Sequence, residues 1–313
     1  MDRISLGTTD VRITPLGAGA WAWAWGDRLF WNFGKGYDAN DVRAAFETCL
    51  VAGIGFFDTA EAYGFGASGK LLGQSVRATK SDVIVATKFF PYPWRWRKVS
   101  LVHALRASLN RLGPVRVDLY QLHQPLPPVA TETWMDALAD AVELRLTRAV
   151  GVPNCSAVQT RRAHAALAER GVPLASNQVK YGLLDRHIER DGIMQTCREL
   201  GVTIIAYSPM EMGLLTGKYT PANLPPRVRG TRCRRESIAR AQPVVGLLRE
   251  IGQARGGKTP AQVAINWTMR KGTVPIPGAK TARQAQENVG ALGWQLSEGE
   301  MAALDAASES AQR

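Results

Sequence analysis

Short runs of apolar residues alternate with longer amphipathic stretches along most of the chain. The runs are nearly continuous in apolar residues and rich in β-branched side chains, which is typical of parallel strands buried on both faces. We therefore expect strands over residues 13–21, 55–60, 83–89, 117–123, 147–152, 174–179, 202–208 and 273–278.

The stretches between these runs follow the 3.6-residue period of a helix, beginning with residues 41–52. Ser100 is the predicted N-cap of a helix over residues 101–112, which Gly113 ends. By the same reasoning we expect helices over residues 131–144, 157–168, 188–200, 236–254 and 260–270, and a last one capped by Thr281.

Eight strands, each followed by a helix, predict an α/β fold of the (β/α)8 TIM barrel type, as a single domain over residues 1–313. Residues 4–7 and 11–14 predict an N-terminal β-hairpin that covers the lower end of the barrel. Residues 211–257 interrupt the alternation. We expect them to form an inserted loop over the mouth of the barrel, not a second domain.

The formal net charge is +12, so binding to nucleic acid has to be considered. The basic residues are scattered, and the densest stretch, residues 227–235, contains no interleaved aromatic residues. A solvated basic surface is therefore favoured over a nucleic-acid partner. The four cysteines show no CxxC spacing, which indicates free thiols in a reducing compartment. With no apolar run of about 18 residues and no signal-like start, we expect a cytoplasmic protein, with an organellar stroma left open.

Four residues with chemically useful side chains fall at or just after three neighbouring predicted strands. Asp58, Lys88 and His123 end the second, third and fourth strands, and Tyr63 follows Asp58 by five residues. In a TIM barrel these ends meet at one mouth, where the active site lies. Tyr63 can donate a proton to a reduced carbonyl if Lys88 lowers its pKa, Asp58 can hold Lys88 charged, and His123 can orient the substrate oxygen.

Each of these residues also has a structural interpretation. Asp58 and Lys88 could form a buried ion pair, Tyr63 could be a rim aromatic, and His123 could be a hydrogen-bonded core histidine. Their convergence from successive strands favours a site. Residues 17–22, GAGAWA, match a dinucleotide-binding fingerprint, but no helix follows directly, so we give this match no weight.

The chain resembles the aldo-keto reductases along nearly its whole length, and is closer to bacterial and plant members. The segments that carry the resemblance include GFFDTAEAYG, VDLYQLHQP, NQVKY and AYSPMEMGLLTGKY. The family's Asp-Tyr-Lys-His tetrad falls on Asp58, Tyr63, Lys88 and His123. The resemblance implies reduction of a small aldehyde or ketone with NADP(H), without a metal. The alternative is an NADPH-binding regulatory subunit like the potassium-channel β subunits.

The resemblance also implies a set of cofactor contacts. Asn154 and Gln178 would hold the nicotinamide carboxamide, although Pro153 stands where a serine is usual. Tyr207 would stack on the nicotinamide ring. The pyrophosphate and adenosine contacts would come from Ser208, Met210, Gly213, Leu214, Gly278, Lys280, Thr281, Arg283, Glu287 and Asn288.

Aromatic residues in the predicted mouth loops favour an apolar carbonyl substrate. Trp21, Trp23 and Trp94 are the expected pocket residues, with Trp25, Phe30, Trp31 and Trp96 nearby. Arg95, Arg97 and Lys98 could instead attract an anionic substrate, and the sequence does not decide between the two. The oligomeric state is likewise left open.

Overall fold

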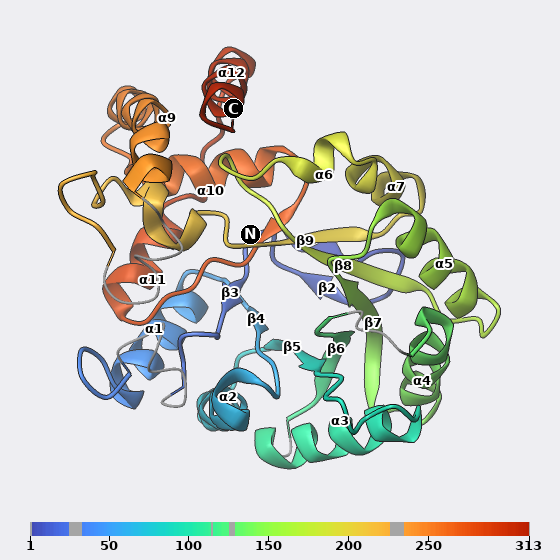
Figure 1. Cartoon of the computed structure of the whole chain (residues 1–313). Helices are drawn as coiled ribbons and strands as arrows, with labels where there is room; N and C mark the ends of the chain where they lie inside the picture. The colour runs from blue at the N-terminus through green and yellow to red at the C-terminus, as the bar shows by residue number, and fades with distance from the viewer. Residues whose placement is uncertain (1, 25–32, 114, 125–128, 226–234, 313) are drawn as a thin grey trace.

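Eight parallel strands form a barrel in the computed structural model, which describes residues 2–24, 33–113, 115–124, 129–225 and 235–312 (Figure 1). Strands that follow one another in sequence are neighbours in the barrel. The strands are β3 (Ala18–Gly19), β4 (Phe56–Asp58), β5 (Ile84–Phe89), β6 (Val117–Leu122), β7 (Thr147–Pro153), β8 (Leu174–Lys180), β9 (Thr203–Tyr207) and β10 (Val274–Pro275).

The barrel closes between its first and last strands. Gly19 forms a parallel bridge with Gly278, and the Gly17 N–H donates to the Pro275 carbonyl at 3.0 Å. A Cβ at Gly19 would lie 2.9 Å from the Ile276 carbonyl oxygen, so this close approach requires glycine. The predicted TIM barrel is confirmed.

The N-terminal hairpin is also confirmed. Strands β1 (Ile4–Ser5) and β2 (Arg12–Ile13) pair antiparallel. Leu6, Val11 and Ile13 are fully buried and pack against apolar side chains of the barrel interior. Because this interior cluster includes Ile84 near the start of β5, the hairpin closes the end of the barrel opposite the carboxyl ends of the strands.

The helices surround the barrel (Figure 1). Amphipathic faces pack on the strands and bury a second, larger apolar shell. None of the described helices combines the length and apolar character needed to cross a bilayer. The helices are α1 (Ala39–Val51), α2 (Ala67–Arg77), α3 (Val99–Leu112), α4 (Thr131–Glu143), α5 (Ala157–Ala168), α6 (His187–Arg190), α7 (Ile193–Glu199), α9 (Arg235–Ala254), α10 (Pro260–Arg270), α11 (Ala282–Val289) and α12 (Glu298–Gln312), with 3₁₀ turns η1 (Tyr63–Gly66) and η2 (Glu211–Thr216).

Two local predictions about the helices are wrong. Helix α3 begins at Val99, so Ser100 lies inside it, and the N-cap is Lys98. The helix expected over residues 188–200 is two helices, α6 and α7, separated at Gly192, which has a φ of 72°. This left-handed backbone ends one helix and starts the next. The predicted cap Thr281 is confirmed by its side-chain hydrogen bond, and Thr259 caps α10 in the same way.

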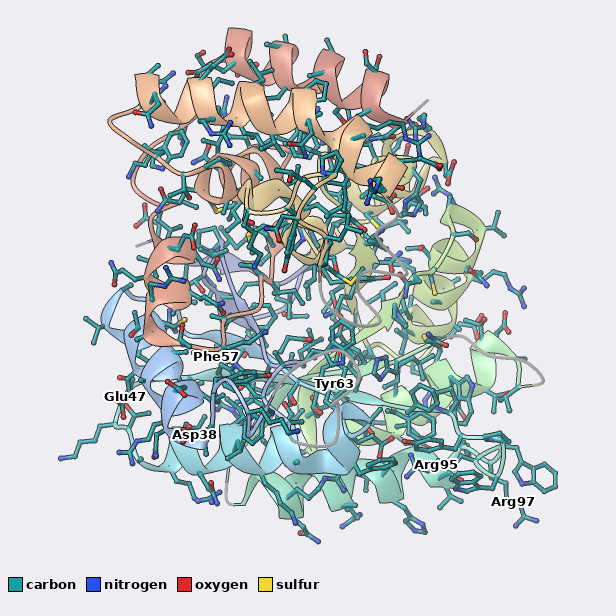
Figure 2. All side chains as sticks on the ribbon, turned by 60° about the vertical axis from the view of Figure 1, so that its left-hand side comes forward. Asp38, Glu47, Phe57, Tyr63, Arg95 and Arg97 are labelled. Atoms are coloured by element: carbon teal, nitrogen blue, oxygen red, sulfur yellow. The ribbon has the colours of Figure 1, made fainter. Side chains whose placement is uncertain are left out.

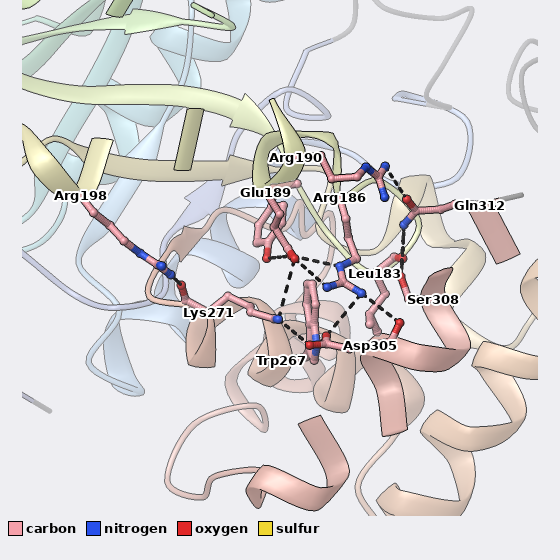
Figure 3. Close-up of polar contacts among 11 residues, drawn as sticks. Leu183, Arg186, Glu189, Arg190, Arg198, Trp267, Lys271, Asp305, Ser308 and Gln312 are labelled. Carbon is pink, nitrogen blue, oxygen red and sulfur yellow. Dashed lines mark hydrogen bonds and ion pairs between the residues drawn. The ribbon is translucent and has the colours of Figure 1, made fainter. Parts of the chain in front are cut away.

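The C-terminal helix α12, which the pattern did not predict, lies beside α9 on the outside of the barrel (Figures 1 and 2). A polar cluster fastens it, centred on Asp305 (Figure 3). The Asp305 carboxylate accepts hydrogen bonds from Trp267 Nε1 at 2.9 Å and Lys271 Nζ at 2.7 Å. The Arg186 guanidinium donates to the Asp305 carbonyl at 2.9 Å and to Glu189. The cluster thus links α12 to α10 and α6.

Candidate active site

The four residues predicted for catalysis meet at the carboxyl ends of three strands. Asp58 ends β4, Lys88 lies near the end of β5, and His123 follows β6 directly. Tyr63 opens η1, the turn that follows β4. The Lys88 ammonium group donates to Asp58 Oδ1, to the Thr59 carbonyl at 2.9 Å and to the Tyr63 hydroxyl at 3.4 Å.

The backbone after Tyr63 turns sharply. Gly64, Phe65 and Gly66 all have left-handed φ values of 56°, 53° and 89°. A side chain at Gly64 would collide with Ala24, 2.4 Å from the added Cβ. This turn leads into α2 at Ala67 and fixes the position of Tyr63 over the end of β5.

The Lys88–Asp58 pair is enclosed in the barrel, with side-chain exposures of 1% and 2%. Burial alone disfavours the ammonium form, but the negative charge of Asp58, together with Tyr63, outweighs it and raises the pKa of Lys88. Lys88 therefore stays charged at neutral pH. A permanent positive charge lies beside the Tyr63 oxygen.

The direction of the Tyr63 shift differs from the prediction. Burial raises the pKa of Tyr63, and the Lys88 charge offsets this only in part. The reason is desolvation: burial destabilises the phenolate by more than the charge of Lys88 stabilises it. At neutral pH Tyr63 is thus a neutral phenol that holds a proton, and Lys88 lies ready to stabilise the anion left when that proton leaves.

His123 contacts Tyr63 with its ring edge-on, the ring centroids 5.4 Å apart. Burial, followed by the Lys88 charge, lowers the pKa of His123 to about 3, so the imidazole is neutral at physiological pH. Its Nδ1 is buried without a hydrogen-bond partner among the described residues. A neutral imidazole still has one N–H to donate, which suits contact with a substrate oxygen.

Gln121 is a buried neighbour of the tetrad that the sequence analysis missed. Its Nε2 donates to Asp58 Oδ2 at 3.3 Å, and Gln178 Nε2 donates to the same oxygen at 2.9 Å. A signal was available: strand period places Gln121 on the same side of β6 as His123. Asp58 is therefore fixed from three directions, by Lys88 on one oxygen and two amides on the other.

The residues expected to hold the nicotinamide lie on the next strands around the mouth. Asn154 follows β7, Gln178 lies on β8 and Tyr207 ends β9. The Tyr207 hydroxyl donates to Asn154 Oδ1 at 3.1 Å, and the Asn154 N–H donates to the Gln178 carbonyl at 2.9 Å. These three residues form one connected group beside the tetrad.

The expected pyrophosphate segment is a series of left-handed turns after β9. Ser208, Glu211, Met212 and Gly213 have φ values of 55°, 46°, 50° and 97°. Of the predicted contacts in this segment, Ser208, Met210 and Gly213 lie in the turns, and Leu214 is buried just beyond them. Lys180 holds the segment, because its Nζ lies 2.8 Å from Glu211 Oε1 and 3.1 Å from Asp185 Oδ2. The sequence analysis did not predict this anchor.

The expected adenosine contacts surround the start and end of α11. Thr281 is its N-cap, Lys280 precedes it and exposed Arg283 lies in its first turn. Glu287 and Asn288 lie near its end, and Asn288 Nδ2 donates to the exposed Gly278 at 3.4 Å. A helix N-terminus flanked by cations suits a phosphate, and the paired amides suit a carboxamide. The chemistry of this donor set fits a nicotinamide dinucleotide.

Of the three expected pocket tryptophans, Trp23 does not reach the mouth. It is fully buried, packs on Phe57 and donates its indole N–H to the Ala279 carbonyl at 2.6 Å. Trp21 lies beside Tyr63, with ring centroids 6.4 Å apart. Trp94 is 69% exposed. Trp25, Phe30 and Trp31 lie outside the described residues.

Aromatic rings lead from the tetrad to the rim. Phe90 contacts His123 edge-on at 5.3 Å between centroids, Tyr92 contacts Phe90 at 4.7 Å, and Trp94 stacks on Tyr92 at 4.9 Å. We call Phe90, Tyr92 and Trp94 the aromatic wall. It provides a hydrophobic face next to His123 and Tyr63.

Two of the three candidate cations of the same loop, Arg95 and Lys98, pair with carboxylates. Arg95 pairs with buried Glu61, which also accepts the Phe90 N–H at 2.7 Å. The guanidinium of Arg95 lies over the Tyr92 ring, 5.1 Å from its centroid. Lys98 pairs with Asp136. The Glu61–Arg95 pair thus supports the aromatic wall.

Comparison with known proteins agrees with this geometry. The family model "Aldo/keto reductase family" matches residues 15–309. The chain belongs to the aldo/keto reductase family. It is 40% identical over 310 residues to the chloroplastic pyridoxal reductase of Arabidopsis thaliana, covering 95% of this chain and 84% of that protein. It is 36% identical over 277 residues to an uncharacterized oxidoreductase of Mycobacterium bovis, covering 85% and 81%.

Among solved structures, this aldo/keto reductase is similar to a thermostable aldo-keto reductase in complex with the inhibitor epalrestat. The TM-score is 0.76 at 29% identity, over 98% of this chain and 100% of that one. The relatives include plant and bacterial members, as predicted. The protein is therefore an oxidoreductase of a family that acts on small carbonyl compounds and typically uses NADP(H). The regulatory-subunit alternative is not favoured.

Proposed function

We propose that this aldo/keto reductase reduces a flat aromatic aldehyde to the alcohol with NADPH, with Tyr63 as the proton donor. The observation that carries the proposal is Lys88, held charged by Asp58 and bonded to the Tyr63 hydroxyl. NADPH oxidation that depends on an added aromatic aldehyde tests it directly. Absence of such turnover across aromatic aldehydes, ketones and quinones would reject the proposal.

The bound cofactor would supply the hydride. The residues of the chain orient the carbonyl oxygen and donate the proton. Tyr63 holds a proton at neutral pH and donates it to the carbonyl oxygen as that oxygen becomes an alkoxide. Lys88 stabilises the resulting phenolate. The neutral His123 donates a hydrogen bond to the same oxygen and orients it. One hydride and one proton account for the alcohol.

The substrate class rests on the aromatic wall. Phe90 lies against His123, so a flat ring whose carbonyl reaches Tyr63 and His123 can pack on Phe90. The Arabidopsis relative is a pyridoxal reductase, and pyridoxal is an aromatic aldehyde of this kind. Pyridoxal is accordingly the first compound to test.

The aromatic wall predicts a selective effect of Phe90→Leu. We expect kcat/KM for pyridoxal or benzaldehyde to fall by up to about tenfold, because one aromatic contact of about 0.5–1.5 kcal/mol is lost. The value for butanal should fall less than about threefold, because butanal has no ring to pack. Trp96→Leu is the matched control, since Trp96 is an exposed aromatic of the same loop outside the wall. Equal losses for both aldehydes with Phe90→Leu would contradict the assignment.

The NADPH preference rests on Lys280 and Arg283 at the start of α11. The double substitution Lys280→Ala with Arg283→Ala should raise the dissociation constant of NADPH by about 10- to 100-fold, because charge-assisted bonds to the 2′-phosphate are lost. The dissociation constant of NADH, which lacks that phosphate, should change little. Fluorescence titration of both cofactors measures this. Equal weakening of both would remove the phosphate assignment.

A further inference from the structure

Asn154 and Gln178 are neighbouring amide side chains at the mouth, on the paired strands β7 and β8. An amide has a carbonyl and an NH₂ group at nearly the same place, so it can present either an acceptor or a donor to a ligand. Which group faces outward depends on what holds the other. In this protein a second layer of residues, Asp58 and Tyr207, holds one end of each amide.

Asp58 determines the orientation of Gln178. An ionised carboxylate can only accept hydrogen bonds, so Gln178 must direct its Nε2 to Asp58 Oδ2, at 2.9 Å. Asp58 itself cannot rotate freely, because Lys88 occupies Oδ1 and Gln121 also donates to Oδ2. Gln121 is in turn held by the Ser176 hydroxyl at 3.3 Å. The Oε1 of Gln178 is thereby left as the outward group.

Asn154 is held by Tyr207 in the opposite orientation. The Tyr207 hydroxyl donates to Asn154 Oδ1 at 3.1 Å, which leaves Nδ2 as the outward group. Asn154 is exposed and has a left-handed φ of 46°, so its side chain projects from the end of β7 rather than continuing the strand. Within the described part of the chain, no hydrogen bond uses Asn154 Nδ2 or Gln178 Oε1.

We infer that Asp58 and Tyr207 are positioning residues that make Gln178 an acceptor and Asn154 a donor for the nicotinamide carboxamide. This inference rests on the proposed binding of NADP(H). A carboxamide has one NH₂ and one carbonyl, so it is complementary to this pair. Because Pro153 has neither a hydroxyl nor a backbone N–H, these two amides carry the recognition. Asp58 thus serves both the proton donor, through Lys88, and the cofactor, through Gln178.

The inference makes Asp58→Asn informative. The Lys88 ammonium would donate its hydrogen bond to the asparagine Oδ1, so the asparagine NH₂ group would face Gln178. Gln178 would have to turn its Oε1 inward to accept from it, and its NH₂ would then face the carboxamide NH₂. A donor would oppose a donor, and the contact would be lost. Activity cannot report this, because Asp58 also supports the tetrad.

The test compares binding of NADP⁺ with its 3-acetylpyridine analogue, in which a methyl group replaces the carboxamide NH₂. Dissociation constants are measured by calorimetry with the full-length protein. The parent protein should bind NADP⁺ about fivefold to tenfold more tightly, the worth of one neutral hydrogen bond. In Asp58→Asn the ratio of the two dissociation constants, that of the analogue divided by that of NADP⁺, should fall to about one. Tyr63→Phe, a tetrad variant that does not touch Gln178, should keep the parental ratio.

Tyr207→Phe should change the affinity for both ligands but not the ratio of their dissociation constants. It removes the hydroxyl that holds Asn154 but keeps the ring, so both ligands, which share the carbonyl, should weaken by the same factor of about five. The ratio should stay parental. If Asp58→Asn does not fold, Asp58→Leu with Lys88→Met removes both buried charges and leaves Gln178 without an acceptor, and the ratio should again fall.

Three results would overturn the inference. They are a parental ratio in every folded Asp58 variant, a ratio near one in the parent protein, or a changed ratio in Tyr207→Phe. In each case NADP⁺ still binds and the proposed function stands. If the parent protein binds neither ligand, the proposed function and this inference both fall.

Discussion

Replacing Tyr63 with phenylalanine is expected to lower kcat for aldehyde reduction by about 10²- to 10⁴-fold, the usual contribution of one general acid. The dissociation constant of NADPH should change little, because the hydroxyl contacts Lys88 and the ring remains. Single-turnover kinetics measures the chemical step apart from binding. The loss should be similar for aromatic and aliphatic aldehydes, since both need the same proton.

Tyr92→Phe is the matched control for this experiment. It removes a phenol hydroxyl from the aromatic wall of the same mouth and leaves the ring. Its kcat should stay close to the parental value. If Tyr63→Phe reduces aldehydes at the parental rate, the proton comes from another group and the role given to Tyr63 is wrong.

Lys88→Met should have the second large effect, on both stability and turnover. It leaves the Asp58 carboxylate buried without its counter-charge, and breaking a buried pair in this way costs about 3–5 kcal/mol of unfolding free energy. Urea denaturation measures this loss. Turnover should fall as well, because nothing would stabilise the Tyr63 phenolate.

Two variants separate these effects. Lys98→Met removes a lysine that pairs with Asp136 at the surface, and its unfolding free energy should stay near the parental value. The double variant Asp58→Leu with Lys88→Met removes both buried charges, so it should recover much of the stability but none of the turnover. A double variant as unstable as Lys88→Met alone would show that the packing of the lysine stem, not its charge, matters.

One carboxylate contacts two neighbouring groups of the site. Asp58 keeps Lys88 charged through one oxygen and holds Gln178 through the other. A carboxylate suits both, because it has two acceptor atoms and no donor. Tyr63 and Gln178, a residue of the expected nicotinamide site, are therefore joined by three hydrogen bonds through Lys88 and Asp58.

Much of this organisation was determined by the sequence alone. Strand and helix periods are local properties, so the eight βα units and the hairpin could be predicted from residue patterns. Parallel strands in a closed barrel bring their carboxyl ends together, and for that reason Asp58, Lys88 and His123 could be placed at one mouth before any coordinates. The caps Thr259 and Thr281 were also predictable, because a cap interacts only within its own first turn.

Only the tertiary structure decided how deeply each group is buried and what it meets there. Trp23 was expected at the mouth but packs in the core, and Arg95 was a candidate anion contact but pairs with Glu61. The pKa of Tyr63 is raised rather than lowered, because desolvation by distant parts of the chain outweighs one neighbouring charge. Burial and pairing sum contributions from residues far apart in sequence, and no local pattern contains that sum.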